Sequence, residues 1–167
     1  GYLEAVELGV ADAILAADGM SVITRMVPYD EALSVETAQR LSSDLSSIVP
    51  GSPGVIGVGH PELREALAAA AAEAGAVVIR GVQRTLIEVG ADPRVTYEVD
   101  GENHSLRCQL LVGADGKTST TRAALGVTLF ATHARVKISG MLVDDGGVWD
   151  RSVTTNAIDG RNQFIVI

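Results

Sequence analysis

The residues best suited to chemistry follow one apolar run, where an acidic residue, two glycines and several hydroxyl side chains lie close together. The run from Leu110 to Val112 is continuous and apolar, as in a strand buried on both faces of a parallel sheet. Gly113 and Gly116 then free the backbone to turn. The carboxyl end of such a strand is where open α/β sheets bind ligands. There Asp115 can accept hydrogen bonds from paired ribose hydroxyls, and Gly116 removes a Cβ that would block a dinucleotide.

A short helix is expected directly after this turn. Thr118 or Ser119 can cap it, and it ends near Leu125. The free N–H groups of its first turn favour an anion such as pyrophosphate. The alternative interpretation is purely structural, with Asp115-Gly116 as a simple turn and Thr118 as a simple cap.

The same segment, LLVGADGKTSTTR, resembles the DG motif of the FAD-dependent monooxygenases of the p-hydroxybenzoate hydroxylase type. That motif is an apolar strand, then Gly-Ala-Asp-Gly, then a Ser three residues on and an Arg three after that. This chain supplies Gly113, Ala114, Asp115, Gly116, Ser119 and Arg122. In the family the motif lies beside the FAD and is implicated in binding both FAD and the nicotinamide donor. The resemblance implies that Ala114, Asp115 and Gly116 contact the cofactor, with Asp115 holding the FAD ribose.

Two further cofactor contacts are implied by the resemblance alone. The family carries a Gln or Arg that reaches the flavin at the head of a helix, with a Leu three residues on. Here His60 and Leu63 hold those positions, and the shorter His60 has a capping or solvated role as its alternative. In the family a strand also passes the adenine, which implies that Val82 and Gln83 lie near that ring. The alternative is that both residues only fill a sheet.

Composition narrows the class of protein. The chain has 167 residues, enough for one domain or one domain plus part of another, and its 47% apolar content is ample for a core. The net charge is -8, and no stretch concentrates basic residues, so a nucleic-acid partner is not expected. The apolar runs are too short to span a membrane and no signal segment opens the chain, which predicts a soluble cytoplasmic protein without a membrane partner.

No metal site or disulfide is expected. The three histidines, His60, His104 and His133, lie far apart and match no metal-ligand spacing. Cys108 is the single cysteine, and its place at the head of an apolar run predicts an inert core thiol.

The elements that must position these residues form a mixed α/β (α+β) pattern. Gly9 and Gly19 are expected to end two short helices, and the alanine-rich segment Pro61 to Gly75 is expected to be a helix. The serine-rich segment Ala32 to Ser47 is ambiguous: it is interpreted as a mobile surface loop, and the alternative is a weak helix lined by Leu33, Leu41 and Leu45. A small three-stranded antiparallel meander is expected before the apolar run. The expected strands are Met20 to Asp30, Val77 to Ile79, Val82 to Val89, Arg94 to Val99, Ser105 to Cys108, Arg135 to Val143 and Gln163 to Ile167.

The resemblance also implies a domain division. Residues 1–126 match a partial FAD-binding domain, and residues 127–167 match the beginning of a substrate-binding β-sheet domain. The chain contains neither the Gly-x-Gly-x-x-Gly turn of the family's first βαβ unit nor its later Gly-Asp segment. It is therefore expected to be a middle portion of the enzyme. Its last strand is expected to be an exposed edge that pairs with another chain.

By resemblance, the complete protein is an enzyme that uses FAD, NAD(P)H and oxygen to hydroxylate a small aromatic or polyketide-like substrate, whereas the fragment alone is inactive. No catalytic acid or base is identified, because Tyr29 and Tyr97 are only weak hydroxyl candidates. Trp149 and Phe164 are expected in core or edge packing, with a cavity wall as the alternative. Two alternative functions remain: another FAD-dependent oxidoreductase, such as a reductase or halogenase, and a non-catalytic α/β fragment that binds no flavin by itself.

Overall fold

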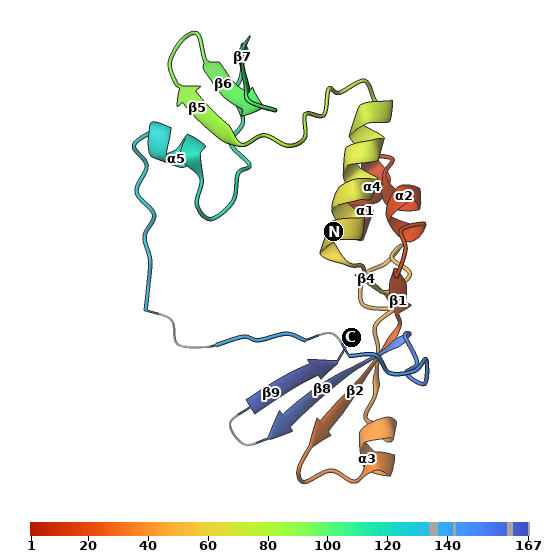
Figure 1. The fold of residues 1–167 in the computed structure, drawn as a ribbon. Coiled ribbons are helices and arrows are strands. Elements are labelled where there is room, and N and C mark those ends of the chain that lie inside the picture. Colours follow the sequence, from red (N-terminus) through yellow and green to blue (C-terminus); the bar gives the residue numbers. More distant parts are fainter. Residues whose placement is uncertain (134–136, 142, 160–161, 167) are drawn as a thin grey trace. The chain divides into compact units, whose positions relative to one another are not determined.

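The computed structural model describes residues 1–133, 137–141, 143–159 and 162–166, and these form a mixed α/β structure with several sheets. The chain divides into two compact units, each described here by itself (Figure 1). Unit 1 comprises Gly1–Val77 with Leu142–Ile167, and unit 2 comprises Val78–Met141.

Three helices of unit 1 lie where the sequence pattern predicts helices. The two short N-terminal helices are α1 (Tyr2–Glu7) and α2 (Ala11–Leu15). Gly9 follows the C-cap residue of α1 and has a positive φ of 70°. The long helix α4 (His60–Glu73) carries a proline in its first turn, and Gly75 follows it with a φ of 93°. The predictions for Gly9, Pro61 and Gly75 are confirmed, because proline is favoured at the start of a helix and glycine just after its end. The prediction that Gly19 ends the second helix was wrong, because α2 ends at Leu15 and Ala16 is its C-cap residue.

A four-stranded sheet in unit 1 joins residues that are far apart in sequence (Figure 1). Its strand order is β3-β2-β8-β9, with β2 and β8 parallel and the other pairs antiparallel. Val27 on β2 is 1% exposed and forms the core with Ala38 and Val153. A separate pair, β1 and β4, is antiparallel. The strands are β1 (Ser21–Ile23), β2 (Arg25–Asp30), β3 (Ser43–Asp44), β4 (Val55–Gly57), β8 (Val153–Asp159) and β9 (Asn162–Val166).

Two predictions for the N-terminal half are corrected: a strand is present but interrupted, and an expected loop contains a helix. The expected strand from Met20 to Asp30 breaks at Thr24, because the N–H groups of Thr24 and Arg25 both donate to the carbonyl of Ser152, at 2.9 and 3.1 Å. The expected loop contains helix α3 (Val35–Arg40).

A serine begins helix α3. The Ser34 hydroxyl accepts a hydrogen bond from the Thr37 N–H at 3.2 Å, and Ala38, 0% exposed, packs the helix into the core of unit 1. Here a serine acts as a cap rather than as a marker of a loop.

Unit 2 contains a three-stranded antiparallel sheet and one short helix. The sheet order is β5-β6-β7, and the turn from β6 to β7 uses Asp100 and Gly101, both with positive φ. Tyr97 and His104 stand opposite each other on one face, and their rings stack with centroids 5.2 Å apart. The short helix α5 contacts β5. The elements are β5 (Arg84–Glu88), β6 (Arg94–Val99), β7 (Glu102–Arg107) and α5 (Thr120–Ala124).

The apolar run before α5 is not a strand in this structure, contrary to the prediction. Leu110 and Val112 are 77% and 74% exposed. Among the described residues no strand pairs with this segment, so its backbone lacks the hydrogen-bonded neighbours that a parallel strand requires. The expected strand from Val77 to Ile79 is absent for the same reason.

The C-terminal predictions met a mixed outcome. The expected strand from Arg135 to Val143 falls partly on residues 135, 136 and 142, which lie outside the described residues, and residues 137–141 are not in a strand. Strand β9 covers most of the last predicted strand, and its Phe164 is 53% exposed at a sheet edge. The indole N–H of Trp149 donates to the Val153 carbonyl at 3.1 Å, which anchors it beside β8.

Candidate functional site

The segment between the apolar run and α5 forms a tight loop that two glycines make possible. At Gly113 a Cβ would lie 2.5 Å from the Cβ of Thr121, so only glycine lets the backbone pass this close to α5. At Gly116 the requirement is conformational, because φ is +74° and nothing lies within 4 Å of the position that a Cβ would take. The backbone around Gly116 is therefore open on the side where a Cβ would project.

The Asp115 carboxylate is the hydrogen-bonding centre of this loop. Its Oδ1 accepts a hydrogen bond from the Ser119 hydroxyl at 2.5 Å. Its Oδ2 accepts from the Thr120 hydroxyl at 2.9 Å and from the Thr121 N–H and hydroxyl at 3.0 and 3.3 Å. Asp115 thus satisfies one of the free N–H groups at the start of α5, in the way that a capping residue does.

These contacts set the charge state of Asp115. The hydrogen bond from Ser119, followed by that from the Thr121 N–H, holds the pKa of the carboxyl far below its usual range. The side chain is consequently ionised at neutral pH.

Two further residues complete the loop. The Ser119 hydroxyl accepts the Arg122 N–H at 2.9 Å, so the predicted cap is confirmed at Ser119 and not at Thr118. The Arg122 guanidinium donates to the carbonyls of Lys117 at 2.6 Å and Gly116 at 3.4 Å. We name this assembly, residues 113–122, the DG loop. Its internal bonds show what Ser119 and Arg122 contribute at their spacing after Asp115: each hydrogen-bonds within the loop.

The DG loop retains capacity for a ligand hydroxyl. An ionised carboxylate has about four lone-pair positions, two on each oxygen. Oδ1 of Asp115 accepts one hydrogen bond within the loop, so it can accept one more, whereas Oδ2 is already fully engaged. With the exposed Ala114 and the open side of Gly116, this arrangement fits one hydroxyl of a cofactor ribose better than a pair.

The other predicted cofactor residues, His60 and Val82, are both exposed. His60 is exposed at the first position of α4 in unit 1, where Gly59 caps the helix without a side chain. Val82 is exposed just before β5 in unit 2, the strand that α5 contacts. The Gln83 N–H donates to the Glu98 carbonyl at 2.9 Å, which extends the β5–β6 pairing. The cofactor roles of His60 and Val82 stay predictions.

The remaining candidates have structural contacts. The Tyr29 hydroxyl accepts a hydrogen bond from the Gln39 side-chain amide at 3.2 Å, and Tyr97 stacks on His104. Cys108 is partly buried, with its Sγ 3.6 Å from the Pro93 carbonyl oxygen. In the described part of the chain, no group of three or more His, Cys, Asp or Glu side chains could hold a metal ion.

Sequence reasoning missed the roles of Thr120 and Thr121, which both bind the Asp115 carboxylate. The available signal was the uninterrupted hydroxyl run from Thr118 to Thr121 directly after an Asp-Gly turn. Among the described residues, no helix is both long enough and apolar enough to cross a membrane.

A family model described as an FAD binding domain matches residues 6–158, a range that includes the entire DG loop. No curated protein matches the chain.

Proposed function

The chain belongs to the FAD-binding domain family, and from this premise we propose that it is part of a flavin-dependent monooxygenase of the p-hydroxybenzoate hydroxylase type. The match across residues 6–158 is the observation that carries the proposal. The DG loop adds independent support, because its glycines and ionised aspartate suit a ribose-containing cofactor.

In this proposal the residues of the DG loop bind and orient FAD. Asp115 accepts a ribose hydroxyl through Oδ1, and Gly116 with Ala114 lets the cofactor approach the backbone. Asp115 is held in place by α5, so its orientation does not depend on the ligand. His60 and Val82 make the additional cofactor contacts. The bound flavin supplies the redox chemistry, and the protein positions it and excludes water.

The substrate side is proposed on the same basis. The complete enzyme hydroxylates a small aromatic or polyketide-like substrate with NAD(P)H and oxygen. Residues 1–126 contribute to the flavin-binding domain, and residues 127–167 begin the substrate-binding sheet. In the structure this C-terminal sheet also includes β2, which pairs with β8 over six residues on each strand.

Flavin binding by the full-length protein is the first test. We expect the purified protein to show a flavin absorbance spectrum or to bind added FAD. Asp115→Ala should weaken FAD binding about tenfold or more, since a hydrogen bond to a charged group contributes roughly 1.5 to 3 kcal/mol. Asp18→Ala is the matched control, because Asp18 is also exposed but lies in unit 1 after α2. A full-length protein that is colourless and ignores added FAD would refute the proposal.

The reaction type needs a separate measurement. If the protein is a hydroxylase, small aromatic or polyketide-like compounds should accelerate NAD(P)H oxidation and leave as hydroxylated products. A protein that binds FAD and oxidises NAD(P)H without hydroxylating any of them would instead be a reductase or another oxidoreductase of the same family.

A further inference from the structure

The three hydroxyl side chains that bind the Asp115 carboxylate differ in how easily a ligand can replace them. Ser119 and Thr121 are only 9% and 8% exposed. The Ser119 hydroxyl also accepts the Arg122 N–H at 2.9 Å, and the backbone N–H of Thr121 adds a further bond to Oδ2 at 3.0 Å. Thr120, in contrast, is exposed, and its hydroxyl makes a single hydrogen bond with the described residues, to Oδ2 at 2.9 Å. Thr120 is therefore the donor of these three that an incoming hydroxyl can displace.

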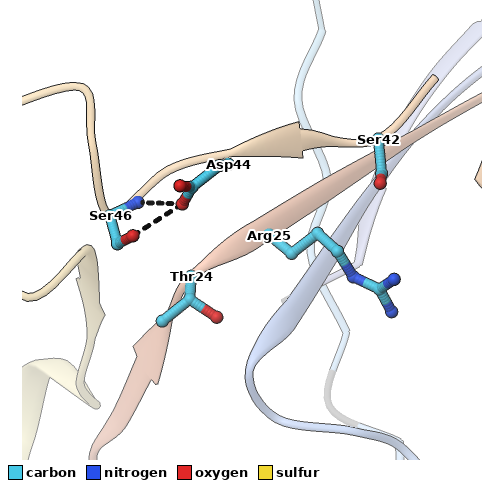
Figure 2. Close-up of a pocket in the computed structure, with 5 residues that line it drawn as sticks. All are labelled: Thr24, Arg25, Ser42, Asp44 and Ser46. Atoms are coloured by element: carbon cyan, nitrogen blue, oxygen red, sulfur yellow. Dashed lines mark hydrogen bonds between the residues drawn. The ribbon is translucent and has the colours of Figure 1, made fainter. Parts of the chain in front are cut away.

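The hydroxyl donors are also divided between the two carboxylate oxygens of Asp115. Ser119 binds Oδ1, whereas Thr120 and Thr121 bind Oδ2. Asp44 in unit 1 differs in this respect, because the Ser46 N–H at 2.8 Å and the Ser46 hydroxyl at 2.6 Å both donate to Oδ1 (Figure 2). In the DG loop both oxygens are engaged, and the acceptor position that stays free is on Oδ1.

This division limits how Asp115 can meet the two neighbouring hydroxyls of a ribose. A carboxylate binds two hydroxyls at once only when each oxygen has a free lone-pair position. Oδ1 of Asp115 has such a position, but Oδ2 gains one only when the Thr120 hydroxyl moves away. That displacement exchanges one hydroxyl donor for another, so it adds little net free energy of binding. A second ribose hydroxyl therefore contributes little while Thr120 is in place.

We propose that Thr120 is the specificity-determining residue that limits Asp115 to one hydroxyl of the cofactor ribose. This inference rests on the proposed flavin function and concerns the same loop. Thr120 acts through Asp115, as a positioning residue that holds the second carboxylate oxygen out of use. Only the ribose hydroxyl that Oδ1 accepts then adds to the affinity for FAD.

The test compares FAD with two FAD analogues, each of which lacks a different one of the two hydroxyls of the adenosine ribose. Each compound is titrated into the full-length protein after its flavin has been removed, and binding is followed by flavin fluorescence. In the native protein one analogue should bind about tenfold more weakly than FAD, and the other should bind as FAD does. The analogue that loses affinity identifies the hydroxyl that Oδ1 accepts.

Three variants test the role of the Thr120 hydroxyl. Thr120→Val removes the hydroxyl, keeps the shape of the side chain and frees a position on Oδ2. It should bind FAD about tenfold more tightly, and both analogues should now bind more weakly than FAD. Thr120→Ser keeps a hydroxyl and should restore the native pattern. Thr118→Val is the matched control, because Thr118 is exposed in the same loop and its hydroxyl has no hydrogen bond with any described residue.

The selectivity pattern decides the inference. A loss for both analogues in Thr120→Val, with a loss for one in Thr120→Ser and Thr118→Val, would support it. An unchanged pattern in Thr120→Val would overturn it. Weaker binding of all three compounds by Thr120→Val would also overturn it, because Thr120 would then only support the loop.

Two further results separate this inference from the flavin proposal. If FAD and both analogues bind the native protein equally well, the inference fails and the flavin proposal stands. If the protein binds no FAD, the flavin proposal fails and the inference fails with it. The Thr121 amide resonance of the labelled 167-residue chain reports whether each variant keeps the loop intact, since this N–H donates to Oδ2 of Asp115.

Discussion

At the scale of single residues, Asp115 shows how one carboxylate can organise a loop and still face a ligand. Three successive residues, Ser119 to Thr121, donate to it, and the Arg122 guanidinium holds the preceding carbonyls. The residues of the motif therefore stabilise the local fold in addition to any contact they make with a ligand. A substitution at Asp115 should disturb α5 as well as any cofactor contact, and the two effects can be measured separately.

The first prediction concerns pH. A carboxyl whose folded pKa is lowered stabilises the fold fully above its unfolded pKa of about 3.9, and that stabilisation is lost as pH falls through the folded pKa. We expect the Thr121 amide resonance to titrate with a midpoint below that of an ordinary aspartate. In Asp115→Asn this transition should disappear. A midpoint of about 3.9 in the native chain would contradict the observed hydrogen bonds.

The second prediction separates the two glycines of the DG loop. Gly113→Ala should disrupt the loop strongly, because its Cβ would lie 2.5 Å from Thr121. Gly116→Ala should cost only about 1 kcal/mol, the strain of a positive φ in a site without a clash. Gly140→Ala is the control, since it has neither a positive φ nor a close neighbour. Urea unfolding of the three variants, with the Thr121 amide as the probe, measures the order of effects, and equal effects at Gly113 and Gly140 would disprove it.

At the scale of elements, the sequence predicts helices whose ends are set by neighbouring residues. It misses strands that form only by pairing with a distant segment of the chain. Helix α4 was predictable because Pro61, an alanine run and Gly75 all act locally. Strand β8 was not, since it is defined by parallel pairing with β2, a segment far away in the chain. The run from Leu110 to Val112 is the converse case, an apolar segment whose pattern indicates a strand but which has no pairing partner among the described residues.

The third prediction concerns helix α3, which has only six residues and depends on its cap. Ser34→Ala removes the acceptor for the Thr37 N–H and should lower the free energy of unfolding of unit 1 by about 1 kcal/mol. Ser34→Asp keeps an acceptor and should retain most of the stability. Chemical denaturation followed at a unit 1 probe measures both variants. Equal losses in Ala and Asp would show that the cap contributes little.

At the scale of the whole molecule, the division into two units follows from the chain's return to β2 rather than from a boundary in composition. Residues 142–167 belong with residues 1–77 because β8 lies parallel to β2 and Val153 completes the core around Val27. The other unit contains the β5-β6-β7 sheet and helix α5, which contacts β5. No local signal in the sequence marks this arrangement, which depends on a non-local pairing.

This division yields the last prediction. Removing residues 142–167 takes away β8 and β9, so β2 keeps only the two-residue strand β3 as a partner and Val27 loses its contact with Val153. Two isolated strands are marginal in water, so amide protection along β2 should collapse in the chain 1–141. Strand β6 pairs on both sides within unit 2, and its protection should remain as in the intact chain. Hydrogen exchange read residue by residue distinguishes this result from a uniform loss of protection, which would mean that the two units unfold together and that the stability of the β5-β6-β7 sheet depends on β8.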